Sequence, residues 1–295
     1  MKKLIPFILI LTFLISLCGC AAENTASGID NDKKIIAVSI VPEATFAQKV
    51  CGDNFEIVTM IPPGASAETY EPTPAEMQKL QKAEVYFAIG VPSEENSILP
   101  SLSKETKTVE LHTESEKIYP ALKIDGGRDP HLWLSPKRVK TMVTAIAEAL
   151  GDIDPENKEL YTANAEKYCH ELTDLDDEIT QLLKDKQNRK FIAYHPSFGY
   201  FADDYSLTQY ALEEHGKEAD AKHMTEIIDL AKKEDIKVIF YQAEISGRQA
   251  AAFAEEIGGT AVCLEPLAAD YTESLKKMAK TLAEVEDIYR PYKQK

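Results

Sequence analysis

The sequence lacks the short motifs of the common catalytic classes. It contains no HExxH, CxxC, GxSxG or Walker loop, so the familiar metalloprotease, redox, hydrolase and nucleotide-binding signatures are missing. Cysteine is also scarce. The three cysteines beyond the N-terminal segment, Cys51, Cys169 and Cys263, are too far apart in the sequence for a metal-thiolate or redox motif. We interpret them mainly as small buried hydrophobic residues, and whether two of them form a disulfide stays open.

Positive charge is in deficit. The 33 lysines and arginines face 49 aspartates and glutamates, which gives a formal net charge of −16. A field of that sign repels nucleic acid and attracts cations, although solubility alone also explains it. A second long apolar run is missing too, so we expect a soluble body behind the N-terminal segment.

The N-terminal segment has the pattern of a bacterial export signal. Two lysines precede an apolar run from Leu4 to Leu17, which is too short for a stable membrane-spanning helix. The run ends in Leu17-Cys18-Gly19-Cys20, which resembles a lipobox with Cys20 as the lipidated first residue of the mature protein. We therefore predict a signal peptide at 1–19 and a polar, lipid-anchored tether at 20–34, which places the protein outside the cytoplasm on the cell membrane. An ordinary signal peptide or an uncleaved anchor is the alternative.

Beyond the tether, short apolar strands alternate with amphipathic helices, which is typical of an α/β fold with mainly parallel sheets. Strands are predicted at 35–41, 55–61, 85–89, 108–111, 191–194, 208–212, 238–241 and 260–264. Helices are predicted at 74–83, from Pro136 to a stop at Gly151, and at 225–234, 248–257 and 274–288. The first of these opens with Thr73-Pro74-Ala75-Glu76, a capping box with proline at the first helical position.

One helix stands out by its length. No glycine or proline interrupts the chain from residue 156 to Lys186, and apolar residues recur at spacings of three and four. The sequence therefore predicts an N-terminal α/β lobe at 35–152, a linking helix at 153–188 and a C-terminal α/β lobe at 189–295. A helix of this length between two lobes indicates a rigid strut.

Two of the six histidines lie where ligand sites of open α/β folds gather. His131 precedes a predicted helix, and His195 directly follows the strand at 191–194. Taken singly, each is better explained by a hydrogen-bonded structural role. Glu68 and Glu265 also follow predicted strands, so each lobe contributes two of the four residues. Two imidazoles and two carboxylates meeting in the cleft between lobes make a competent divalent-metal site.

Four separated segments carry a resemblance to a known family: PPGASAETYEPTP at 62–74, DPHLWLSP at 129–136, FIAYHPSFGYFADDYSL at 191–207 and LEPLAADY at 264–271. They resemble the zinc- and manganese-binding solute-binding lipoproteins of ABC importers, over nearly the whole mature chain. The resemblance implies two α/β lobes joined rigidly by a long helix, one metal ion between them, and delivery of that ion to a membrane permease.

The resemblance also implies ligands, position by position. His131 and His195 match two ligand histidines of the family, and Glu265 stands where the family usually has an aspartate. Glu68 stands where many members have a histidine, which puts the metal preference in doubt. Glu244 is a reserve carboxylate in case Glu68 does not ligate. The chain also lacks the histidine-rich insertion of many zinc-specific members.

These observations favour a monomeric metal carrier over an enzyme. We expect capture of one divalent ion, zinc first, with manganese or iron as alternatives, and delivery to an ABC permease without nucleic acid as a partner. A metal-dependent hydrolase with Glu68 or Glu244 as general base is one competing hypothesis, but it needs an open coordination position. A surface adhesin is the other, and nothing in the sequence resembles a repeat or an aromatic binding face.

Overall fold

The structure is a computed structural model, and it describes residues 33–124, 126–213, 219–245 and 247–289. The predicted signal peptide at 1–19, the lipidation site Cys20 and all but the last two residues of the tether at 20–34 lie outside these ranges. The described residues belong to one compact unit. Among them, no helix combines the length and the apolar character needed to cross a membrane.

The first half of the unit is built on a four-stranded parallel sheet, ordered β2-β1-β3-β4. Its strands are β1 (Lys34–Val38), β2 (Phe55–Thr59), β3 (Ala83–Ala88) and β4 (Lys107–Glu110). Its crossover helices are α2 (Val41–Cys51) and α3 (Pro74–Leu80). After β4 come α4 (Leu111–Glu116) and the short antiparallel pair β5 (Lys123–Ile124) and β6 (Gly127–Arg128). All four strands are parallel, so their carboxyl ends lie at one edge of the sheet, and the loop after β2 leaves from this edge.

The second half repeats this plan with the order β10-β9-β7-β8, again all parallel. Its strands are β7 (Lys190–Ala193), β8 (Thr208–Ala211), β9 (Val238–Gln242) and β10 (Thr260–Leu264). Its helices are α7 (Gly199–Asp204), α8 (Ala221–Lys233), α9 (Gly247–Glu256) and α10 (Tyr271–Tyr289). The predicted fold class, two α/β lobes with parallel sheets joined by a long helix, is confirmed.

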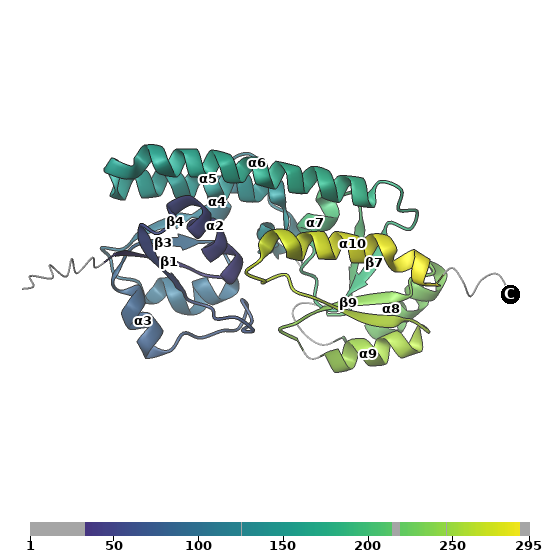
Figure 1. The fold of residues 1–295 in the computed structure, drawn as a ribbon. Helices are drawn as coiled ribbons and strands as arrows, with labels where there is room; N and C mark the ends of the chain where they lie inside the picture. Colours follow the sequence, from purple (N-terminus) through teal and green to yellow (C-terminus); the bar gives the residue numbers. More distant parts are fainter. Residues whose placement is uncertain (1–32, 125, 214–218, 246, 290–295) are drawn as a thin grey trace, which may run out of the picture. The chain divides into compact units, whose positions relative to one another are not determined.

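The long helix is α6 (Lys158–Leu183), 26 residues or about 39 Å long. It starts after a short 3-10 turn at Pro155–Asn157 and ends three residues before the predicted end at Lys186. Its buried side chains recur at helical spacing: Tyr161, Ala165, Tyr168, Leu172, Leu175, Ile179 and Leu183. With this face α6 packs against α2 and α5 (Pro136–Ile153) of the first half and against α10 of the second (Figure 1).

Trp133 ties the two halves together directly. Its indole Nε1 donates to the carbonyl of Pro266 at 3.1 Å, and its own carbonyl accepts from the Tyr271 hydroxyl at 2.8 Å. The ring of Tyr271 in turn meets Phe46 of α2 edge-on, with centroids 4.9 Å apart. All these side chains are buried, so opening the halves would break hydrogen bonds and expose apolar surface.

Several predicted boundaries were wrong by two to four residues, and two of them have a clear physical reason. The first strand ends at Val38 instead of Val41, because Pro42 lies in the first turn of α2 and the Glu43 carboxylate accepts the backbone N–H of Ser39. Gly151 does not end α5, which continues to Ile153. A Cβ on Gly151 would lie 2.8 Å from Cγ of Lys158, so this glycine allows α6 to approach closely.

Candidate metal centre

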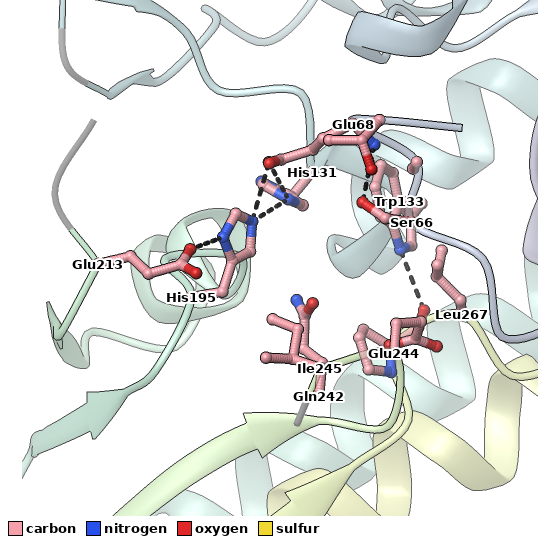
Figure 2. Close-up of a pocket in the computed structure, with 13 residues that line it drawn as sticks. Ser66, Glu68, His131, Trp133, His195, Glu213, Gln242, Glu244, Ile245 and Leu267 are labelled. Carbon is pink, nitrogen blue, oxygen red and sulfur yellow. Dashed lines mark hydrogen bonds and ion pairs between the residues drawn. The ribbon is translucent and has the colours of Figure 1, made fainter. Parts of the chain in front are cut away.

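Three of the predicted ligands meet at the carboxyl edges of the two sheets. Glu68 lies in the loop after β2, His131 immediately precedes the 3-10 turn Leu132–Leu134, and His195 follows β7. One ligand atom from each residue lies within 4.8 Å of the others (Figure 2). Both histidines are buried, while the side chain of Glu68 is 32% exposed.

Local hydrogen bonds hold the segments that carry these residues. The predicted capping box of α3 is present, since Thr73 and Glu76 each accept the other's backbone N–H. The Tyr70 hydroxyl also donates to the Glu76 carboxylate, which secures the loop carrying Glu68 to this helix. After His131, the Ser135 hydroxyl caps α5 by accepting from Arg138 N.

The donor spacing suits a small tetrahedral ion. The Nε2 atoms of His131 and His195 are 3.3 Å apart. Two nitrogens that each lie about 2.0–2.1 Å from a tetrahedral zinc ion are separated by roughly 3.3–3.4 Å. Oε1 of Glu68 lies 2.9 Å from Nε2 of His195 and 4.0 Å from Nε2 of His131, so a small shift of this carboxylate completes three corners of a tetrahedron.

Each histidine is oriented by a carboxylate on its other ring nitrogen. Nδ1 of His131 lies 2.8 Å from Oδ1 of Asp129, which also accepts the His131 backbone N–H at 2.9 Å. Nδ1 of His195 lies 2.6 Å from Oε2 of Glu213. Such pairs fix the ring and direct Nε2 toward the ion. Asp129 lies two residues before His131 in the segment at 129–136, whereas Glu213 was not identified from the sequence.

The site is electrostatically prepared for a cation. Burial by itself lowers the pKa of His195, but hydrogen bonds to Glu213 and Glu68 outweigh it and raise this pKa to about 9. Burial raises the pKa of Glu68, and the hydrogen bond and charge of His195 reverse this and lower it. The positive charge of protonated His195 therefore balances part of the negative charge of the two carboxylates beside it. A bound metal ion would balance that charge in its place.

The three donors line a cavity of about 190 Å³. Its walls include Trp133, whose ring lies 5.3 Å from that of His131, and the second half contributes Gln242, Glu244 and Leu267 (Figure 2). Drug-sized ligands occupy cavities of about 300–1,000 Å³. The dimensions suit an ion with a few waters better than an organic molecule.

The structure does not bring Glu265 to the other three. Its carboxylate lies 3.2 Å from Nζ of Lys277 on α10, its side chain is 54% exposed, and it lines a separate surface groove. Its carbonyl accepts from the Ser274 hydroxyl, which anchors the backbone in the turn before α10. A ligand role for Glu265 stays a prediction, and it requires the side chain to leave Lys277.

Two parallel sheets joined by a strut helix, with imidazole and carboxylate donors between them, define a solute-binding protein built for a metal ion. Residues 36–285 match the model of the family described as "Zinc-uptake complex component A periplasmic". The match spans most of the chain, so the chain belongs to this family, and the resemblance inferred from the four segments is confirmed.

Individual relatives agree with this assignment. The chain is 28% identical over 270 residues to the high-affinity zinc uptake system protein ZnuA of Bacillus subtilis, covering 86% of this chain and 85% of the relative. It is 27% identical over 255 residues to the manganese-binding lipoprotein MntA of Halalkalibacterium halodurans, covering 83% of each. A crystal structure of ZnuA superposes with a TM-score of 0.80 at 35% identity, covering 86% of this chain and 99% of that one.

Proposed function

We propose that this protein captures one divalent transition-metal ion outside the cytoplasm and delivers it to the permease of an ABC importer. The observation that carries the proposal is the convergence of Glu68, His131 and His195, with the two Nε2 atoms at tetrahedral spacing and both imidazoles oriented by carboxylates. The names of relatives, which include zinc uptake and manganese-binding proteins, support the class of cargo.

Zinc is the first choice of cargo, manganese the second and iron the third. Two imidazoles suit zinc well, and the intrinsic order of affinities places zinc above manganese and iron. Glu68 adds a hard oxygen donor that makes the site more tolerant of manganese than a site with a third histidine would be.

The proposal treats the protein as a carrier and not as a hydrolase. Metal-assisted hydrolysis requires an open coordination position and room for a substrate next to it. A cavity of about 190 Å³ with two buried imidazoles gives little such room. We further propose a monomer that is attached to the cell membrane through lipidated Cys20. Its N-terminal lobe is residues 35–152, its linking helix residues 153–188 and its C-terminal lobe residues 189–295.

The test is metal binding by the purified mature chain. Competition titrations at defined free zinc, manganese and iron should give one ion per chain, with zinc bound most tightly. His131→Ala and His195→Ala should each lower zinc affinity at least about tenfold, or about 1.4 kcal/mol. Wild-type affinity for zinc and manganese in both alanine variants would refute the site, and esterase, phosphatase or peptidase turnover would favour the hydrolase.

A further inference from the structure

The three converging donors leave a tetrahedral ion one ligand short. They also leave a charge imbalance, because one carboxylate and two neutral imidazoles carry a single negative charge against a divalent ion. Glu68 and His131 come from the first half of the unit, whereas His195 is the sole donor from the second. A further donor is therefore expected from the second half.

Glu244 lies two residues past the carboxyl end of β9 and lines the same cavity as the three donors. β9 is hydrogen-bonded to β7, the strand that leads to His195. The Glu244 side chain is half-buried, and its Oε2 is fully buried without a hydrogen-bond partner. Within the ranges that the structure describes, no lysine, arginine or histidine pairs with it. A carboxylate oxygen in this condition is costly to bury, and a cation next to it removes the cost.

A second polar side chain lines the same wall of the cavity. Gln242 is 9% exposed and lines the cavity, and Figure 2 shows its amide pointing toward the two histidines. Its side chain makes no hydrogen bond to the described part of the chain. The Gln242 amide is open to the cavity, so this wall combines an accessible polar group with the buried, unpaired Oε2 of Glu244, which suits a polar or charged occupant.

Glu265, the other acidic residue near the end of this sheet, is in the opposite condition. It is exposed and already paired with Lys277. To ligate, it would have to break that ion pair and lose its contact with solvent, whereas Glu244 would only gain a partner for a buried oxygen. The balance of desolvation and pairing thus favours Glu244.

We propose that Glu244 is the fourth donor, and that its carboxylate moves onto the ion after Glu68, His131 and His195 have bound it. This inference rests on the proposed function. Movement is needed because Glu244 lies outside the group of donors within 4.8 Å of one another, and rotation of its side chain across the cavity supplies it. The loaded site then has two donors from each half and two carboxylates that balance the charge of the ion.

The test compares two matched substitutions, Glu244→Gln and Glu265→Gln, by competition titration with Zn²⁺ and Mn²⁺. Glu244→Gln should weaken zinc binding at least about tenfold, as expected for loss of a charged donor. Glu265→Gln should stay within about twofold, since an exposed ion pair contributes little. Near-parental affinity in Glu244→Gln overturns the proposal, whichever value Glu265→Gln shows.

Thermal melting separates a ligand from a structural residue. In the metal-free protein, Glu244→Gln should melt at the parental temperature or above, because the change removes an unpaired charge, yet zinc should raise its melting temperature less than that of the parent. A lower metal-free melting temperature with parental zinc affinity would show a structural role. Glu244→Asp, which keeps the charge but shortens the reach, should bind zinc with intermediate affinity; parental affinity in this variant argues against direct ligation.

His131→Ala distinguishes the two levels of the argument. If the parent binds no stoichiometric metal and His131→Ala changes nothing, the proposed function fails. If the parent binds one ion, His131→Ala weakens it and Glu244→Gln does not, only the fourth-donor assignment fails.

Discussion

Zinc binding should release about one proton per ion at pH 7, because His195 holds a proton where the metal will bind. Its ring nitrogens face Glu213 at 2.6 Å and Glu68 at 2.9 Å, and these contacts overcome burial to raise its pKa to about 9. The nitrogen that faces Glu68 is the one that must ligate, and a ligating imidazole must be neutral. The metal therefore has to displace the proton.

The size of the effect follows from this pKa. Proton competition multiplies the apparent Kd by one plus the ratio of protonated to neutral His195, which is about 11 at pH 8 and roughly 1,000 at pH 6 for a pKa of about 9. Zinc affinity should thus fall about 90-fold between pH 8 and pH 6, or roughly 2.7 kcal/mol.

Isothermal titration calorimetry in two buffers of different ionisation enthalpy measures the released protons directly, and competition with a chelator across pH 6–8 measures the affinity. Glu213→Gln is the matched variant, because it removes the carboxylate at Nδ1 and leaves His195 in place. Its pH dependence should be shallower, since the pKa of His195 falls. Release of no proton at pH 7, or a zinc affinity that is flat from pH 6 to pH 8, would refute the assignment of a protonated His195.

Three further outcomes are expected. Asp129→Asn should weaken zinc binding about 10- to 100-fold in chelator competition while its metal-free melting changes little, because the imidazole loses its charged acceptor. Gly199→Ala should also weaken binding, since the new Cβ would lie 2.5 Å from Oδ2 of Asp129 and push that carboxylate away from the ring it orients; parental affinity would show that the site tolerates the shift. Burial raises the pKa of Glu94 to about 7 and, with the charge of Glu94, raises that of Glu43 well above its usual value, so the free energy of unfolding should decline as pH rises from about 4.5 to about 7. Glu43→Gln should reduce this decline by about 1 kcal/mol or more in urea unfolding at pH 5 and pH 8, and an unchanged decline would exclude the pair as its cause.

The sequence predicts the main elements because proline, glycine and capping residues mark their ends. Thr73 and Glu76 cap α3 as their spacing predicts, and the uninterrupted pattern after Pro155 becomes α6. His131 and His195 were identified because each adjoins a predicted element boundary, and such boundaries gather at the sheet edges. These features depend on residues that are close together along the chain, and a single sequence shows such residues directly.

Features that depend on neighbouring strands were not predictable in this way. Glu213 reaches His195 because β7 and β8 are paired with Ala193 opposite Ala211, so the residues two positions later meet. Neither segment alone determines which strands pair in the sheet. The direction of the Glu265 side chain likewise depends on Lys277, which lies on the following helix and becomes a neighbour only after folding.

Trp133, which is hydrogen-bonded to both Pro266 and Tyr271, comes two residues after the proposed ligand His131. We therefore expect a carrier whose halves are fastened this close to the bound ion to keep nearly the same overall shape with and without it. An importer then cannot distinguish the two states by how far the lobes are apart. What differs between the two states is then local: the charge in the cavity and the positions of the side chains that bind the ion.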